Sequence, residues 1–355
     1  MRKMAVLIPG YKEDAVIVDV ANDALNQKYP KELFDVVVIA DSFRQETIDA
    51  LKALSIILVE VSFEKSTKSK ALNKAMETIG NNFDVAVVLD ADNLMMNDFL
   101  LKINHAFNCG FKVVQGHRVA KNLNTHFAVL DAISEEVNNH IFRKGHRNLG
   151  LSSALIGSGM AFDYHLFKTT MANVNAIGGF DKELELKLLR DNIKIEFLNN
   201  ALVLDEKVQK PDVFANQRKR WLSAQFIYFR RYFFSGLKHL IVRGNVDFFD
   251  KVFQMVSPPR VLLLGLTTLF AMVFGFLALL PGAQDILALQ FTTWLALAIL
   301  VYVSFVLAVP ISFYTQKTLI AFFSLPKAFI LMFLSLFKLK GANKKFIHTA
   351  HGVEK

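Results

Sequence analysis

The run Ala86-Val87-Val88-Leu89-Asp90-Ala91-Asp92 places two carboxylates at the end of an apolar stretch. The apolar part predicts a buried strand, and strands in an open α/β sheet end at the crevice where ligands bind. Two acidic side chains there repel each other unless a positive partner lies near, most commonly a divalent cation that carries phosphate. The run therefore predicts a sheet with a ligand site, although an Asp-x-Asp by itself fits a turn or a helix cap equally well.

Apolar runs and helical patterns alternate through the first half of the chain. Strands are predicted at 4–9, 35–40, 56–61, 84–90 and 112–115, and helices at 13–26, 45–54, 66–79 and 97–108. Strands separated by helices are typical of βαβ units and of a mostly parallel sheet. The predicted fold class is therefore α/β, a Rossmann-like domain followed by α-helical membrane segments. A longer helix is predicted at 125–142, before a Gly/Ser-rich stretch at 150–159.

Hydrophobic residues make up 53% of the chain, and charges become sparse after Pro258. Residues 261–280 carry no charge and are long enough to span a bilayer as a helix. Residues 291–313 form a second uncharged stretch. A third stretch, 319–337, is interrupted by Pro326-Lys327, which favours an interfacial or re-entrant segment. Together these stretches predict a membrane-associated region at 259–340.

Basic residues flank the first two stretches, whereas the loop between them contains Asp285 and no Lys or Arg. The positive-inside rule then predicts a multi-pass protein of the cytoplasmic (inner) membrane, with the first domain and a basic tail at 341–355 in the cytoplasm. The net charge of +9 fits attraction to anionic membrane lipids better than nucleic-acid binding, because the basic residues crowd near the membrane stretches. The single Cys109 excludes an internal disulfide and fits a reducing compartment.

The segment 222–258 begins with an amphipathic helical pattern. One face carries Leu222, Phe226, Phe229, Phe233, Leu237 and Leu240. Arg231 and Lys238 lie on the opposite face. A helix with this pattern is suited to the membrane interface. The alternative is an ordinary helix packed on the soluble domain.

Polar residues follow three of the predicted strands. They are Pro9, Tyr11 and Glu13 at the end of the first strand, Asp41 after the second, and Asp90 and Asp92 after the fourth. Because the carboxyl ends of parallel strands meet at one edge of a sheet, these residues are expected to line one crevice. A further cluster, Gln217-Arg218-Lys219-Arg220-Trp221, precedes the amphipathic segment.

The order of these elements makes the chain resemble a membrane-embedded family 2 glycosyltransferase, of the branch that includes cellulose and hyaluronan synthases. That family has a Tyr-x-Glu turn, an Asp after the second strand, Asp-x-Asp, a distal Asp, and Gln-x-x-Arg-Trp before membrane helices. The resemblance covers most of residues 4–313. It implies a GT-A-type domain at 1–221. It also implies a nucleotide-sugar donor, expected to be UDP-linked, that is bound in part by Pro9, Tyr11 and Glu13.

Such a donor needs a carboxylate for its base, and Asp41 is placed to accept that hydrogen bond; its alternative role is a turn-forming Asp before Ser42. The diphosphate leaving group needs its charge neutralised. Mg²⁺ or Mn²⁺ held by Asp92, with Asp90 near the metal or the ribose, suits such oxygen ligands. Lys70 is predicted either to reach a phosphate or the nucleotide, or to be a solvated lysine in the first turn of its helix.

Attack on the anomeric carbon of the sugar also needs a base for the acceptor hydroxyl, and partial burial raises the proton affinity of a carboxylate. The candidate is Asp181, with Glu183 as the fallback and Glu185 as a weaker choice. The family usually has Glu before this base, whereas this chain has Phe180. The alternative is that Asp181 caps the helix that follows, a role that does not exclude catalysis.

By the same resemblance, Arg220 faces the diphosphate, Trp221 forms the floor under the acceptor sugar, and Gln217 makes a polar contact near the nucleotide or the acceptor. An Arg-Trp pair beside a membrane helix is otherwise an interfacial anchor.

The expected reaction is inverting transfer of a sugar that extends a β-linked polysaccharide processively at the membrane, with a homo-oligomer or accessory subunits as possible assemblies. One alternative is the transfer of a single sugar to a lipid or lipid-phosphate acceptor. Another is an inactive membrane scaffold that binds nucleotide.

Overall fold

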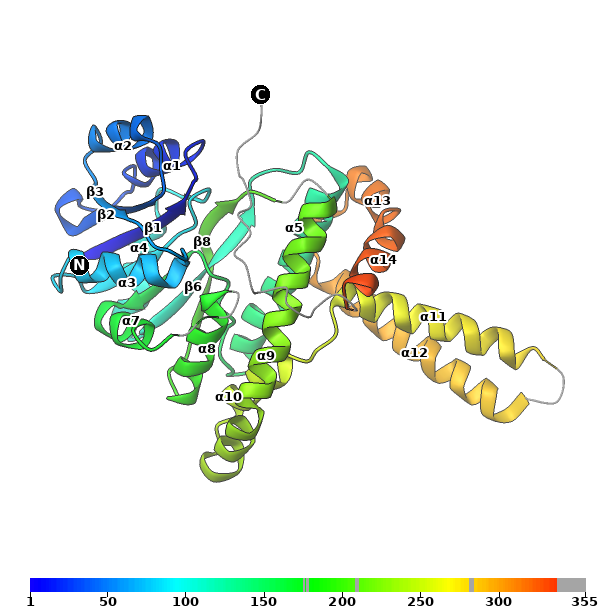
Figure 1. Cartoon of the computed structure of the whole chain (residues 1–355). Helices are drawn as coiled ribbons and strands as arrows, with labels where there is room; N and C mark the ends of the chain where they lie inside the picture. The colour runs from blue at the N-terminus through cyan, green and yellow to red at the C-terminus, as the bar shows by residue number, and fades with distance from the viewer. Residues whose placement is uncertain (175, 177–178, 208–210, 281–283, 337–355) are drawn as a thin grey trace.

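The computed structural model describes residues 1–355 except 175, 177–178, 208–210, 281–283 and 337–355, and it leaves the side chains of 211–218 and 284–286 undescribed. Most of the chain before the last helices forms an α/β domain built on one sheet. A hairpin of two long helices projects away from this domain (Figure 1). The predicted basic tail at 341–355 lies outside the described residues.

Among the described residues, eight strands form one sheet in the order β3-β2-β1-β4-β7-β6-β8-β5. The strands are β1 (Met4–Tyr11), β2 (Phe34–Asp41), β3 (Ile57–Val61), β4 (Val85–Val88), β5 (Leu94–Met95), β6 (Val113–Ala120), β7 (Met160–Asp163) and β8 (Glu196–Asp205). Strands β1 to β4 are parallel, as are β6 and β8, whereas β7 runs antiparallel to β4 and β6, and β5 to β8. The predicted mostly parallel α/β sheet is confirmed.

Helices cover both faces of this sheet because the strands alternate their side chains between two cores. Met4 and Val6 join one core and Ala5 and Leu7 the other. The first core is covered by α1 (Ile17–Ala24), α2 (Gln45–Lys52) and α4 (Phe99–Asn108), and the second by α3 (Lys68–Thr78), α7 (Tyr164–Met171) and α8 (Phe180–Arg190). Burial on both faces explains why the parallel strands are continuous apolar runs.

The long helix predicted at 125–142 is two consecutive segments. Helix α5 (His126–Asn138) begins where the Thr125 side chain accepts a hydrogen bond from the Ala128 N–H. It continues as π-helical turns over Asn139–Gly145 and ends in α6 (His146–Asn148). Gly145 permits these wide turns, because a Cβ there would come within 2.9 Å of the His140 carbonyl oxygen.

The predicted interface segment lies in α9 (Pro211–Arg243) and α10 (Val246–Gln254). Ala224, Tyr228 and Tyr232 of α9 are buried in the core shared with α8, which is the packing of an ordinary helix on the domain. Of the predicted apolar face, Phe229 and Phe233 pack against this core, whereas Phe226 is exposed. That face is therefore divided between the core and the surface, and contact with lipid stays a prediction.

Two described helices are long and apolar enough to cross a membrane: α11 (Arg260–Ala278) and the segment Leu287–Ala308 of α12 (Gln284–Ala308). The predicted bounds 291–313 of the second span are wrong, because α12 begins earlier and ends two residues before Pro310, which cannot donate a helical hydrogen bond.

The third predicted stretch is two short helices. They are α13 (Gln316–Phe322) and α14 (Leu325–Leu336), bent by 45°, which fits a broken span or a re-entrant loop. Pro326 lies in the first turn of α14, where a missing N–H is tolerated.

Candidate active site

The turns after β1, β2 and β4 meet at the carboxyl edge of the sheet. A Cβ on Gly10 would come within 2.6 Å of the Phe43 ring and 3.7 Å of the Ala91 side chain. Only glycine therefore lets the end of β1 lie under both neighbouring turns. Tyr11 pairs with Asp41 on the adjacent strand. The structure thus brings the Pro9-to-Glu13 turn, Asp41 and the Asp-x-Asp turn to one place.

Asp41 is buried at the end of β2. Its carboxylate accepts a 3.0 Å hydrogen bond from the Ser42 hydroxyl, and its carbonyl oxygen accepts one of 3.1 Å from the Lys12 N–H. Lys12 and Ser42 both have positive φ, 56° and 60°, which is uncommon for residues other than glycine. Strained backbone of this kind clusters at functional sites. The Ser42 contact also fits the turn-forming role.

The Asp-x-Asp turn is pinned from the Gly/Ser-rich stretch. The Asp90 N–H donates a 2.8 Å hydrogen bond to the Ser158 hydroxyl, which in turn donates to the Asn93 side chain. The Asn93 amide donates to Asp92 Oδ1 at 3.2 Å. Asp92 is 4% exposed, whereas the Asp90 side chain is 35% exposed. Strand β4 ends at Val88, so both carboxylates lie in the turn rather than on the strand.

Lys68 is the lysine that contacts this turn. Its ammonium lies 2.5 Å from Asp90 Oδ1 and donates to the Gly157 carbonyl oxygen at 2.8 Å. The predicted Lys70 is exposed, and its ammonium donates instead to the carbonyl oxygen of Lys65. The sequence did not predict this role for Lys68. The available signal was Thr67, whose side chain caps α3 and makes Lys68 the first helical residue.

Asp181 lies in the first turn of α8 and faces the same loop. A Cβ on Gly157, which has φ +90°, would lie 3.8 Å from the Asp181 carboxyl carbon. Burial raises the pKa of Asp181, and the Lys182 ammonium at 3.9 Å offsets part of that rise. The helix begins at Phe180 and its N-cap residue is Gly179, so Asp181 is not the cap. Asp90, Lys68 and Asp181 thus surround Gly157.

The two other acidic residues of α8 are committed to ion pairs. Glu183 lies 3.7 Å from both Lys187 and Arg231. Glu185 is fully buried, pairs with Lys251 of α10 at 3.0 Å and accepts a hydrogen bond from the Leu155 N–H. The Lys251 charge helps to hold the pKa of Glu185 below its usual range against the effect of burial. These contacts leave Asp181 as the better candidate for a base.

The Arg220-Trp221 pair lies on α9, where the domain meets the apolar C-terminal helices. The next residue, Leu222, packs with Leu262 of α11 and Met332 of α14. Burial lowers the pKa of Arg220, and Trp221 is 42% exposed. Gln217 belongs to α9, but its side chain lies outside the described part of the chain. The roles assigned to these three residues stay predictions.

The donor set fits a cation that arrives with phosphate. Asp90 and Asp92 offer carboxylate oxygens on one turn, and no group of three or more His, Cys, Asp or Glu side chains that could hold a metal occurs among the described residues. Mg²⁺ in such sites is usually bound by one or two carboxylates plus substrate phosphates, and Mn²⁺ accepts the same oxygen ligands.

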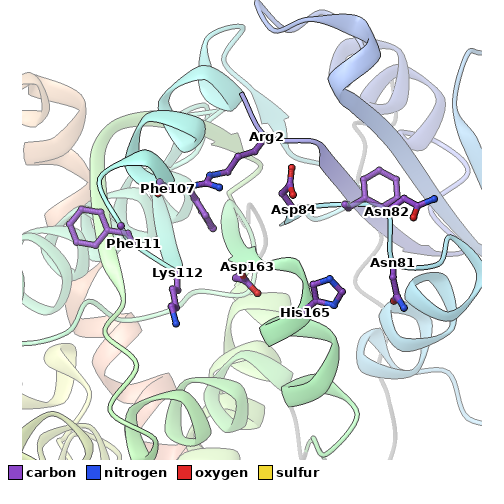
Figure 2. Close-up of a pocket in the computed structure, with 11 residues that line it drawn as sticks. Arg2, Asn81, Asn82, Asp84, Phe107, Phe111, Lys112, Asp163 and His165 are labelled. Atoms are coloured by element: carbon purple, nitrogen blue, oxygen red, sulfur yellow. Dashed lines mark hydrogen bonds between the residues drawn. The ribbon is translucent and has the colours of Figure 1, made fainter.

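A cavity of about 600 Å³ opens at the other edge of the sheet (Figure 2). It is lined by Arg2 before β1, Asp84 before β4 and Lys112 before β6, and by Asp163 at the end of the antiparallel strand β7 with His165 just after it. These positions are the amino ends of the parallel strands, so this cavity is separate from the crevice that holds Asp90.

Comparisons with known proteins agree with this geometry. The family described as "Glycosyltransferase like family 2" matches residues 2–224. The probable glycosyltransferase YdaM of Bacillus subtilis (strain 168) is 24% identical over 243 residues, 62% of this chain and 54% of that protein. The beta-monoglucosyldiacylglycerol synthase of Trichormus variabilis is 25% identical over 232 residues, 61% of this chain and 48% of that protein. The chain therefore spans about half the length of these curated relatives.

Among solved structures, the chain is similar to the mannosyltransferase PcManGT from Pyrobaculum calidifontis, solved in complex with GDP-Man and Mn²⁺. The TM-score is 0.51 at 16% sequence identity, and the match covers 86% of this chain and 87% of that one. At this identity, the likeness supports the fold.

Proposed function

The chain belongs to glycosyltransferase-like family 2, with a GT-A-like domain, and we propose that it transfers one sugar from a nucleotide-sugar donor to a lipid acceptor at the membrane surface. The observation that carries this proposal is the packing of Leu222, next to Arg220 and Trp221, on Leu262 and Met332 of the membrane helices. This packing supports an acceptor end of the site that lies beside the bilayer. A relative named for glucosyldiacylglycerol synthesis supports a lipid acceptor.

The proposed donor, a UDP-sugar, binds along the carboxyl edge. Asp41 accepts a hydrogen bond from its base, and the turn with Tyr11 lies beside it. Asp92 and Asp90 would hold Mg²⁺ or Mn²⁺ against the diphosphate, and the ion would offset charge on that leaving group. Lys68, already 2.5 Å from Asp90, adds a positive group at the same place.

The proposed chemistry is inverting displacement. Asp181 accepts the proton of the acceptor hydroxyl while that oxygen bonds to the anomeric carbon and the bond to the diphosphate breaks. Its raised pKa suits this role, because it makes the carboxylate a stronger base. Arg220 would donate to the departing diphosphate, and Trp221 would pack under the acceptor.

The extension of a β-linked polysaccharide is the second candidate, since the Gln217-to-Trp221 motif is the one found in the cellulose and hyaluronan synthase branch. The positive-inside pattern supports a cytoplasmic location for either activity.

The test is nucleotide release by the detergent-solubilised protein with a panel of UDP- and GDP-sugars, Mn²⁺ and diacylglycerol in mixed micelles, followed by mass spectrometry of the lipids. A product one sugar heavier than the lipid supports the proposal. A ladder of larger products supports extension of a polysaccharide instead. Bound UDP with no release from any donor contradicts both and supports the inactive scaffold.

A further inference from the structure

A ring of mostly buried charged side chains lies behind the Asp-x-Asp turn. Its members come from four separate segments of the chain. They are Asp90, Asp92 and Asn93 of the turn, Arg118 of β6, Glu135 of α5, Asp205 at the end of β8, and Lys207 just after it.

Arg118 is the residue that joins the ring to the turn. Its Nε donates a 2.7 Å hydrogen bond to Glu135, and its Nη1 lies 3.4 Å from Asp205 and 3.9 Å from Asp90 Oδ2. The Asp90 carboxylate therefore has Lys68 near one oxygen and Arg118 near the other.

The ring closes through Lys207 and Asn93. The Lys207 ammonium donates to Asp205 at 2.7 Å and to Glu135. The Asn93 amide donates to Asp205 at 3.0 Å and to Asp92 at 3.2 Å. Both carboxylates of the turn are thus tied to Asp205, one through Arg118 and the other through Asn93.

Burial makes this arrangement specific rather than incidental. The Lys207 side chain is 1% exposed, and those of Glu135 and Arg118 are also buried or nearly so. Burial alone would raise the pKa of Glu135, but the charges of Arg118 and Lys207 hold it well below its usual range. A charge in such a place is tolerated only when it is paired, so the geometry of each member depends on the others.

Helix α5 fixes the ring from its far side. Glu135 belongs to α5, whose Ile133 packs with Ala308 and Ala321 of the membrane region. Arg260 at the start of α11 donates to Ser134 of the same helix at 3.1 Å. The residue that anchors Arg118 is therefore held between the sheet and the membrane helices.

We propose that Arg118 is a positioning residue for the cation-diphosphate end of the donor site. Held by Glu135 and Asp205, it fixes the Asp90 carboxylate so that this group and Asp92 face one cation in spite of their mutual repulsion. The inference rests on the proposed function, because it names a residue that supports the cation-binding carboxylates. Partners that orient metal ligands in this way typically change metal affinity or activity by about 10- to 100-fold when they are replaced.

The experiment measures Mn²⁺ binding to the full-length, detergent-solubilised protein in the presence of UDP, with free Mn²⁺ followed by electron paramagnetic resonance. In Arg118→Met, we expect the dissociation constant of Mn²⁺ to rise by about 10- to 100-fold. Arg118→Lys keeps the charge but loses the planar fork of donors, so it is expected to fall between Arg118→Met and the wild type. In Arg118→Met, we expect kcat at saturating Mn²⁺ to stay closer to the wild-type value than kcat/KM for Mn²⁺ does.

The matched control is Arg147→Met. Arg147 forms a comparable two-point pair with Glu196, at 2.9 and 2.7 Å, and Glu196 lies at the opposite end of β8 from Asp205. Its loss is expected to lower thermal stability and to leave Mn²⁺ affinity unchanged.

The outcomes separate this inference from the proposed function. If the wild type binds no Mn²⁺ with UDP, the cation role falls and the positioning role falls with it. If the wild type binds and folded Arg118→Met binds equally well, only the positioning role is overturned. If Arg118→Met does not fold, the test uses Arg118→Lys and the isosteric Glu135→Gln. Wild-type Mn²⁺ affinity in both variants overturns the inference, and weaker Mn²⁺ binding in both supports it.

Discussion

The two edges of the sheet both carry charged side chains, but those side chains have different kinds of partner. At the amino edge, Asp84 accepts from the Lys3 N–H, Asp163 from the Leu166 N–H, and Arg2 donates to the Phe107 carbonyl oxygen. Each of these charges satisfies backbone groups at strand or helix ends. All three side chains line the cavity at this edge (Figure 2).

At the carboxyl edge the charged groups contact other charged groups. Lys68 meets Asp90, and Arg118 meets Asp90 and Asp205, across long stretches of sequence. Charges that are held against one another, rather than used as caps, are typical of sites that bind charged ligands. Strand direction and charge pairing therefore favour the carboxyl edge as the candidate site, although the cavity lies at the amino edge.

The largest expected effect contrasts two aspartates at the two edges. Asp181→Asn removes the proposed base and is expected to lower the transfer rate by about 10²- to 10⁴-fold. Asp163→Asn keeps the cap of α7, because Asn accepts the same hydrogen bond, and is expected to leave the rate unchanged. Initial rates with the donor identified in the panel measure both. Equal rates for Asp181→Asn and the wild type would remove Asp181 from the mechanism.

The next effect contrasts two lysines on one helix. Lys68→Met removes a charged contact at Asp90 and is expected to lower kcat/KM for the donor by about 10- to 100-fold, since hydrogen bonds to charged groups contribute about 1.5–3 kcal/mol. Lys70→Met, at an exposed position, is expected to have no effect on kcat/KM. The reverse ranking would return the phosphate-binding role to Lys70.

A smaller effect concerns pH. The base acts only when deprotonated, so kcat/KM falls as the pH drops through the raised pKa of Asp181. The Lys182 charge lowers that pKa, and Lys182→Met is therefore expected to move the acid limb to higher pH, by up to about one unit. The control is Lys168→Met, because the ammonium of Lys168 contacts Asn81 beside the amino-edge cavity. An acid limb that moves to lower pH in Lys182→Met contradicts the assignment.

The smallest effect is structural. Gly110 lines the amino-edge cavity with φ +92° and open space around it, so Gly110→Ala is expected to cost only the left-handed strain, about 1–2 kcal/mol of unfolding free energy. Gly10→Ala meets Phe43 at the other edge and is expected to weaken UDP binding as well. Thermal unfolding with and without UDP distinguishes the two. If Gly110→Ala weakened UDP binding as Gly10→Ala does, the assignment of UDP to the carboxyl edge would be contradicted.

The sheet and the position of the crevice were predictable from the sequence because they depend on local apolar patterns. The runs that became β1, β2 and β4 are short, continuous and bounded by polar turns, so their carboxyl ends could be placed together. The Asp181 assignment depended on a motif, and the structure adds its neighbour Gly157.

The remaining features depend on contacts between distant segments. The ring that links Asp90 to Arg118, Glu135 and Asp205 joins residues that no periodicity relates. The choice between Lys68 and Lys70 turned on which side of the first turn of α3 faces the crevice. The predicted bounds of the second span were wrong because they followed the uncharged residues alone. The helix ends before Pro310, although the uncharged stretch continues past it.

The most direct test of the carboxyl-edge site is hydrogen–deuterium exchange of the full-length protein with and without UDP and Mn²⁺. We expect slower exchange in segments 10–14, 41–44 and 90–94 when UDP and Mn²⁺ are present, and unchanged exchange in segments 81–84 and 110–112. Protection at 81–84 and 110–112, with the carboxyl-edge segments unchanged, would contradict it.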